Sequence, residues 1–185
     1  MSTPVVLRPG DRVLVTRLNY LGDVVLSLPM VDALRRAHPG VEVDYLSREP
    51  GASLLRGDAR FERVFAWHDG IAAAARTVLL LRRRRYRAVI DLYSNPRSAW
   101  LSRLSGAPVR VGGNRRGRRL LYTHPISAPA GAPVTDVFLH YAAPFGVRGP
   151  AGKPSLVLSE AEGRAAVSPP ARAHRKAPRS EEKHR

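Results

Sequence analysis

Short apolar runs alternate with helical patterns along most of the chain. Residues 13–16 (VLVT) are β-branched and apolar, which predicts a buried strand. From Asp23 onward, apolar residues recur at the spacing of one helix face as far as Leu34, and Pro39-Gly40 predicts where that helix ends. The start of the chain therefore predicts a strand, a tight turn and an amphipathic helix.

The same alternation continues further along the chain. Later strands are predicted at residues 41–46, 63–67, 88–92, 108–111 and 155–158. Later helices are predicted at residues 50–55, 71–84, 96–105 and 136–145. Strands and helices that alternate at short spacing predict an α/β fold, in which a parallel sheet is flanked by helices.

The composition changes after residue 162. Residues 163–185 are rich in proline, lysine and arginine and have little apolar content beyond alanine and valine, which predicts a disordered basic tail. We therefore expect an N-terminal extension at residues 1–11, one folded domain at residues 12–162 and the tail at residues 163–185.

The charge balance predicts anionic partners. The chain has 31 Lys and Arg against 15 Asp and Glu, a net charge of +16. Nucleic acid, phosphorylated substrates and acidic membranes all fit this charge, and so do arginine-rich faces that are merely solvated. The four arginines at residues 82–85 fit the end of a helix or a patch that faces a membrane. Aromatic residues make up only 6% and no recognition motif is present, so we expect no nucleic-acid binding.

Several classes of site are excluded or disfavoured by the sequence. The chain has no cysteine, so disulfides and thiolate metal sites are excluded, and the six histidines have no metal-ligand spacing. The turn LNYLGD has one glycine and is not a dinucleotide fingerprint, and no GKS or GKT follows a glycine-rich loop. No apolar run approaches the roughly 18 residues that a membrane-spanning helix needs.

Asp23 is the first candidate for chemistry. It lies where the first strand gives way to a helix, at the carboxyl edge of a parallel sheet, which is where ligands bind. A carboxylate that faces a cleft there can act as a general base. An N-cap aspartate that only satisfies backbone donors has the same sequence position, and the spacing alone favours that interpretation.

Two basic segments are candidates for binding an anion at the same edge. Asn95 and Arg97 lie at another predicted strand-to-helix turn, so they can contribute to the same cleft as Asp23. The segment GGNRRGRR at residues 112–119 is a basic loop that glycines loosen, and arginine side chains bind phosphate and carboxylate groups through two hydrogen bonds. A solvated surface loop explains this segment equally well.

Two segments of the chain resemble glycosyltransferase family 9, the ADP-heptose:lipopolysaccharide heptosyltransferases. They are RVLVTRLNYLGDVVLSLPMVDALRRAHPG at residues 12–40 and VIDLYSNPRSAWLSRLSGAPVRVGGNRRGRRLLYTHPI at residues 89–126. The resemblance implies a GT-B architecture, in which two Rossmann-like domains face each other, and this chain matches the N-terminal, acceptor-binding domain. It implies inverting, metal-independent transfer with no cofactor and with ADP-heptose as the donor substrate.

The resemblance also implies roles for individual residues. Asp23 matches the carboxylate expected to deprotonate a hydroxyl of the acceptor sugar. The family commonly has Gln-Gly where this chain has Tyr93-Ser94. Contacts to a phosphorylated, carboxylate-bearing acceptor are expected from six residues: Asn19, Asn95, Arg97, Arg115, Arg116 and Arg119.

The family's donor-binding half has no counterpart in this sequence. We therefore expect a truncated transferase that lacks the C-terminal domain, with a nucleotide-sugar and an anionic glycolipid acceptor as partners. We expect a cytoplasmic protein that can contact the inner membrane peripherally. The alternative hypothesis is a non-catalytic module that binds anionic glycolipid or membrane.

Overall fold

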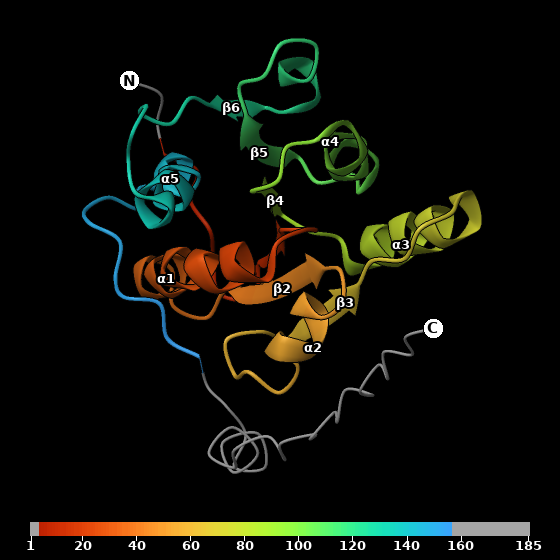
Figure 1. Ribbon diagram of the computed structural model, residues 1–185, viewed down its shortest axis with the longest axis horizontal. Helices are drawn as coiled ribbons and strands as arrows, with labels where there is room; N and C mark the ends of the chain where they lie inside the picture. The colour runs from red at the N-terminus through yellow and green to blue at the C-terminus, as the bar shows by residue number, and fades with distance from the viewer. Residues whose placement is uncertain (1–3, 157–185) are drawn as a thin grey trace, which may run out of the picture.

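Six parallel strands form one sheet in the computed structural model, which describes residues 4–156 (Figure 1). The strand order is β3-β2-β1-β4-β5-β6, and every neighbouring pair is parallel. The strands are β1 (Arg12–Thr16), β2 (Glu42–Ser47), β3 (Arg63–Ala66), β4 (Ala88–Asp91), β5 (Val109–Gly113) and β6 (His124–Ile126). This order is that of a Rossmann sheet. The chain builds the sheet outward from β1 in one direction (β1, β2, β3) and then, starting with β4 on the other side of β1, in the opposite direction. The predicted α/β fold with a Rossmann-like parallel sheet is confirmed.

Helices cover both faces of the sheet (Figure 1). The helices are α1 (Leu21–Ala37), α2 (Gly51–Leu55), α3 (Ile71–Arg84), α4 (Pro96–Leu104) and α5 (Val134–His140), with 3₁₀ turns η1 (Arg119–Leu121) and η2 (Ala143–Phe145). Side chains of α1, α2 and α5 pack on one face, and side chains of α3 and α4 pack on the other.

Alternating residues of the strands feed two separate cores. Val13 and Val15 of β1 pack with Leu28 of α1, whereas Leu14 between them packs with Leu81 of α3 and Leu101 of α4. All of these side chains are buried. Burial on both faces explains why β1 and β4 are nearly continuous apolar runs, whereas β2 (EVDYLS) was expected from its alternating pattern.

The structure differs from the sequence prediction at three places. Strand β6 was not predicted, because three residues that include Pro125 make no apolar run; proline is tolerated there because β6 is an edge strand. Ser155 and Leu156 lie in no strand, so the predicted strand at 155–158 is wrong over these two residues, and the rest of it lies outside the described residues. The predicted helix at 136–145 is divided between α5 and η2.

Residues before β1 already pack onto the domain. The Leu7 side chain is buried in the core beneath α1, and the Val5 backbone N–H donates to the Pro144 carbonyl at 2.7 Å. Residue 12 is thus the start of the first strand, whereas the folded domain already includes residues that precede it. The predicted tail at residues 163–185 lies outside the described residues.

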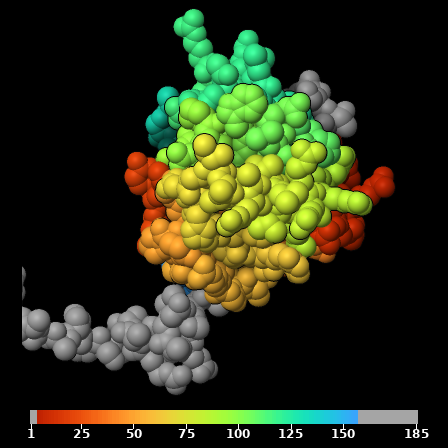
Figure 2. Space-filling model, turned by 90° about the vertical axis from the view of Figure 1, so that its right-hand side faces the viewer, coloured from red at the N-terminus to blue at the C-terminus, as the bar shows by residue number. Residues whose placement is uncertain are grey.

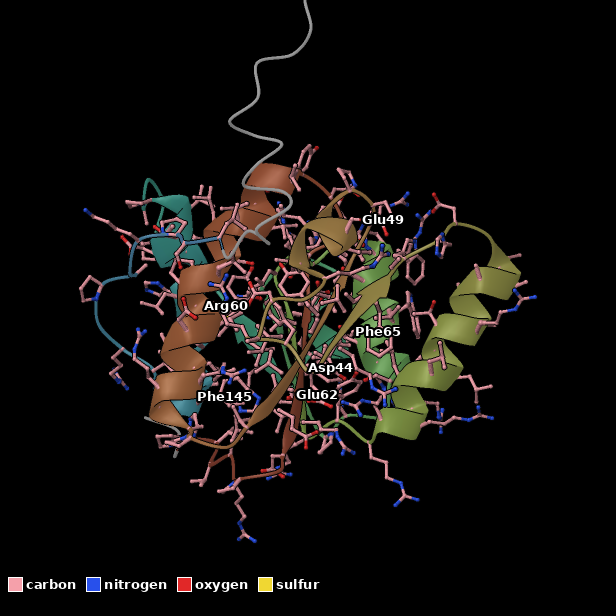
Figure 3. The ribbon with its side chains drawn as sticks, turned by 90° about the horizontal axis from the view of Figure 1, so that it is seen from below. Asp44, Glu49, Arg60, Glu62, Phe65 and Phe145 are labelled. Atoms are coloured by element: carbon pink, nitrogen blue, oxygen red, sulfur yellow. The ribbon has the colours of Figure 1, made fainter. Side chains whose placement is uncertain are left out.

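A buried ion pair attaches the end of α3 to the sheet. Asp44, in the middle of β2, accepts hydrogen bonds from Arg84 Nε at 2.9 Å and from the Tyr86 hydroxyl at 2.6 Å (Figure 3). Burial of a carboxylate is costly unless it is paired and hydrogen-bonded, as it is here. Of the four arginines at residues 82–85, Arg84 therefore turns inward, while the other three are exposed.

Strand β5 approaches a tyrosine ring so closely that no side chain fits at residue 112. A Cβ atom added to Gly112 would overlap the ring of Tyr122, whose hydroxyl donates to Asp91 Oδ2 at 2.7 Å. Gly113 is less crowded, since its added Cβ would lie 3.1 Å from the Tyr141 hydroxyl and 3.2 Å from Ser94 Oγ. Gly112, which was expected to loosen a loop, is therefore required for close packing at the end of β5.

We predict that Gly112→Ala destabilises the fold. The added methyl must displace the Tyr122 ring, and overpacking of this kind costs about 1–3 kcal/mol. Urea denaturation should show a lower midpoint with an unchanged slope. Gly152→Ala is the matched control, because nothing lies within 4 Å of its added Cβ; equal stability of the two variants would contradict this account.

Candidate functional site

The loops that follow β1 and β4 meet at the carboxyl edge of the sheet. Arg17 Nη1 donates to the Leu92 carbonyl at 3.0 Å, and Asn19 Nδ2 donates to the Tyr93 hydroxyl at 2.7 Å. These bonds join the two loops at the position where the strand order reverses, which is the usual ligand position in such sheets.

Asp23 lies in the first turn of α1, and its side chain does not cap the helix. The N-cap residue is Tyr20, no side chain caps this end, and Asp23 Oδ2 instead accepts a hydrogen bond from Arg17 Nη2. The N-cap interpretation of Asp23 is therefore wrong. The Asp23 side chain is 24% exposed, and no described residue donates a hydrogen bond to its other oxygen, Oδ1. This oxygen is available to an incoming hydroxyl group.

Aromatic rings fix the position of Arg17. Its guanidinium carbon lies 5.1 Å from the ring centre of Tyr93, 5.5 Å from that of Phe138 and 5.9 Å from that of Tyr20. The Arg17 side chain is 12% exposed. Tyr20 has a φ of 64°, the left-handed region that is uncommon for a residue other than glycine. Arg17 thus holds Asp23 from a position that is packed among three aromatic rings.

A pocket of about 250 Å³ lies between the turns that follow β1 and β2, and it is lined by sequence neighbours of Arg17 and Asp23 but by neither of these two residues. Asn19 and Arg48 give it polar groups, and Leu18 and Val24 give it apolar ones. Gly51 is buried in its wall, where an added Cβ would lie 2.6 Å from Ser47 Oγ. The remaining lining residues are Tyr20, Leu21, Ser47, Glu49 and Pro50.

Two arginines at this edge share one carboxylate. Arg48 follows β2 and donates to both oxygens of Asp69, at 2.7 and 2.6 Å, and Arg97 in the first turn of α4 donates to Asp69 Oδ1 at 2.7 Å. The hydrogen bonds and the charge of Arg48 hold the pKa of Asp69 below its ordinary value, and Trp67 and Arg97 act in the same direction. Two cations and one anion leave a net positive charge, which suits an anionic ligand.

Within residues 4–156, the other predicted acceptor contacts make no hydrogen bond to Asp23 or Asp69. Asn95 is the N-cap of α4: its Oδ1 accepts from the Ser98 backbone N–H at 2.7 Å, and Ser98 Oγ accepts from the Asn95 N–H at 3.1 Å. Arg115, Arg116 and Arg119 are exposed on the segment after β5, and none of them pairs with a carboxylate within residues 4–156. Asn19 and Asp23 lie close together in the sequence, in the turn after β1 and the first turn of α1. Arg97 lies at the same edge of the sheet, where it donates to Asp69.

A buried carboxylate shapes the loop after β4. Asp91 Oδ1 accepts from Thr16 Oγ1 at 3.0 Å, from the Ser94 N–H at 2.9 Å and from the Tyr93 N–H at 3.1 Å. Burial raises the pKa of Asp91, against the opposing effect of these hydrogen bonds. Asp91 is fully buried, so we assign it the positioning of Tyr93 and Ser94 rather than contact with a ligand.

Sequence reasoning missed Arg17, Arg48 and Asp69 of this site, and it noted Tyr93 only as a departure from the family pattern. Each lies in a loop that directly follows a strand, and the carboxyl ends of parallel strands meet at one edge. A systematic list of polar and aromatic residues after each predicted strand would have found them. Within residues 4–156, no group of three or more His, Asp or Glu could hold a metal ion, and no helix is long and apolar enough to cross a bilayer.

We predict that Asn95 acts mainly as a helix cap. Asn95→Ala should lower the free energy of unfolding by about 1 kcal/mol, because the N–H of Ser98 loses its acceptor. Asn95→Ser should retain most of the stability, since serine caps nearly as well. Urea denaturation of both variants tests this, and equal losses would argue against the capping role.

Comparison with known proteins identifies the family. The sequence model of glycosyltransferase family 9 (heptosyltransferase) matches residues 75–178, more than half of the chain. A search of curated protein sequences gives no match.

Solved structures share the fold. The family 9 glycosyltransferase from Veillonella parvula DSM 2008 has a TM-score of 0.72 at 21% identity, covering 84% of this chain and 47% of its own. E. coli ADP-heptose LPS heptosyltransferase II gives 0.71 at 20%, covering 83% and 49%. E. coli heptosyltransferase WaaC with ADP-2-deoxy-2-fluoro heptose gives 0.64 at 24%, covering 77% and 51%. The chain spans about half the length of each, and the extent of the family match shows that it belongs to glycosyltransferase family 9.

Proposed function

We propose that this chain is the acceptor-binding half of a glycosyltransferase that transfers heptose from ADP-heptose, with Asp23 as the general base. The observation that carries the proposal is the Asp23 carboxylate, which Arg17 holds at the carboxyl edge of β1 with one oxygen free. The donor class is supported by family membership and by the similar E. coli WaaC, which was solved with ADP and with ADP-2-deoxy-2-fluoro heptose.

The proposed step is a single displacement. Asp23 Oδ1 takes the proton of an acceptor hydroxyl, the hydroxyl oxygen bonds to the anomeric carbon of the heptose, and the bond from that carbon to ADP breaks. The configuration at the anomeric carbon is inverted, and ADP leaves with the bonding electrons. Arg17 anchors Oδ2, so that Oδ1 is the oxygen presented to the acceptor.

The arginines at this edge would hold the acceptor's anionic groups. Arg48 and Arg97 already bind one carboxylate, that of Asp69, in the geometry that an acceptor phosphate or carboxylate could share or replace. Arg115, Arg116 and Arg119 supply exposed guanidinium groups beyond β5. The acceptor that fits is an anionic glycolipid of the lipopolysaccharide inner core or a related glycan.

Three further expectations stay predictions: metal-independent transfer, location in the cytoplasm, and peripheral contact with the inner membrane. The non-catalytic alternative stays a hypothesis, and the free oxygen of Asp23 is the reason to prefer an enzymatic role.

We predict that Asp23→Asn abolishes transfer without abolishing the fold. The assay measures ADP release from ADP-heptose with an inner-core acceptor, after the chain is fused to the C-terminal half of E. coli WaaC. Loss of a general base should lower kcat by roughly 10²–10⁴-fold. Glu62→Gln, which neutralises an exposed acid on the far side of β2, is the matched control. Full activity of Asp23→Asn would refute the assignment.

We predict that acceptor binding can be measured on this chain by itself. Titration with a phosphorylated inner-core oligosaccharide in a calorimeter should give a Kd that rises roughly tenfold or more in Arg97→Gln, which loses charge-assisted hydrogen bonds. Asp23→Asn should bind the oligosaccharide nearly as well as the original chain, because Asp23 is proposed to remove a proton during transfer and no transfer takes place in this titration. Arg36→Gln, on the last turn of α1, controls for net charge, and an equal loss there would contradict a specific site.

A further inference from the structure

One segment of the chain is rich in arginine and nearly free of acids. From Gly70 to Thr135 the chain has thirteen arginines and a single acid, Asp91, and Asp91 is fully buried. Helices α3 and α4 fall in this segment and contain no acidic residue. Two of these arginines pair with acids from outside the segment, Arg84 with Asp44 and Arg97 with Asp69, and the others have no carboxylate partner within residues 4–156.

Large apolar side chains are exposed on the same two helices. Helices α3 and α4 pack side by side and form the face seen in Figure 2, in yellow and green. Trp100 on α4 is 56% exposed, and Leu79 and Leu80 on α3 are 51% and 49% exposed. We define the α3–α4 face by its six central residues: Arg76, Leu79, Leu80, Arg83, Trp100 and Arg103.

The spacing of these residues makes the face continuous. Arg76, Leu79, Leu80 and Arg83 recur at intervals of three and four residues, which places them on one side of α3. Trp100, Arg103 and Leu104 do the same on α4. The opposite sides of both helices supply the buried Leu81 and Leu101 of the core. Each helix therefore presents a mixed basic and apolar stripe outward.

The arginines of this face are free of ion pairs. Arg76, Arg83 and Arg103 pair with no carboxylate within residues 4–156, in contrast to Arg84, which is bound to Asp44. Burial first, and the charge of Arg103 second, lower the pKa of Arg110 on β5. Like charges are thus crowded here, and an anionic partner would relieve their repulsion.

We propose that the α3–α4 face docks on an anionic lipid bilayer. Anionic headgroups satisfy the arginines, and the headgroup–acyl boundary takes up Leu79, Leu80 and the Trp100 ring, whose amphipathic character suits that depth. A nucleic acid would match the charge, but it offers nothing to the two exposed leucines, and a single tryptophan makes no stacking platform. The bilayer matches both halves of the pattern.

This inference deepens the proposed peripheral contact with the inner membrane, on which it rests, by naming the face that makes the contact, and it does not depend on Asp23. Helices α3 and α4 begin at the carboxyl edge of the sheet, where Arg97 lies, so the two helices that carry the docked face start at the same edge as the candidate site.

The chain has its own reporter for the test. It contains two tryptophans, of which Trp67 is buried and Trp100 is exposed. Vesicles of phosphatidylcholine with 30% phosphatidylglycerol should shift the emission to the blue and sediment the protein, and vesicles of phosphatidylcholine alone should do neither. Trp100→Phe should lose the shift and still sediment, since Arg76, Arg83 and Arg103 remain.

The matched variants separate the face from net charge. The triple variant Arg76→Gln, Arg83→Gln and Arg103→Gln should weaken partition on the order of a hundredfold, because each arginine near an anionic bilayer contributes about fivefold. The control triple removes the same charge from other elements: Arg8→Gln, Arg36→Gln and Arg148→Gln. Circular dichroism confirms that each variant is folded.

Four results of the binding tests would overturn the proposal. They are equal weakening by the two triples, binding to neutral and anionic vesicles alike, an unchanged Trp100 emission in protein that sediments with vesicles, and binding of a single-stranded oligonucleotide without binding to vesicles. A fifth concerns the protein without lipid. Self-association that buries Trp100 in the absence of lipid would assign the face to a second copy of the chain and would also overturn it. Transfer activity can fail with vesicle binding intact, so the two proposals are tested separately.

Discussion

The carboxylate of Asp91 is the interaction on which the arrangement of the site depends. It is reached from Thr16 at the end of β1, from the loop after β4 and from Tyr122 beyond β5, so one buried anion ties three strand ends together. The loop that it shapes carries Tyr93, which lies against Arg17, and Arg17 holds Asp23. The carboxyl group of Asp91, whose burial costs free energy, thus determines where the carboxylate of Asp23 is presented.

The positions of the acids determine which arginines are paired and which are left without a carboxylate partner. Seven acids of the described chain are in ion pairs with arginine: Asp23, Asp32, Glu42, Asp44, Glu49, Asp58 and Asp69. Most lie on β2, α1 and the connections around them, so the arginine excess is left to α3, α4 and the segment after β5. Within residues 4–156, the unpaired arginines are therefore concentrated on these elements rather than spread evenly around the sheet.

The fold could be predicted from the sequence wherever apolar runs were long enough. Strands β1 to β5 and helices α1 to α4 were all expected, because apolar or alternating runs mark the strands and apolar residues at helical spacing mark the helices. Strand β6 has three residues and a proline, and its pairing with β5 is a tertiary fact that no local pattern reveals. The site was only partly predicted for the same reason. The turn in the sequence indicates Asp23. The role of Arg17 depends on its packing against Tyr93 and Phe138, which are distant in the sequence, so no local pattern indicates it.

The close approach of Gly112 to Tyr122 has an evolutionary consequence. The two positions share one volume, so a relative with a larger residue at the position of Gly112 must have a smaller one at that of Tyr122. That exchange would remove the phenol from Asp91 and leave one oxygen of the buried carboxylate without a donor. The three positions should therefore change together or not at all, as a covarying group that lies outside the reacting centre and yet preserves its shape.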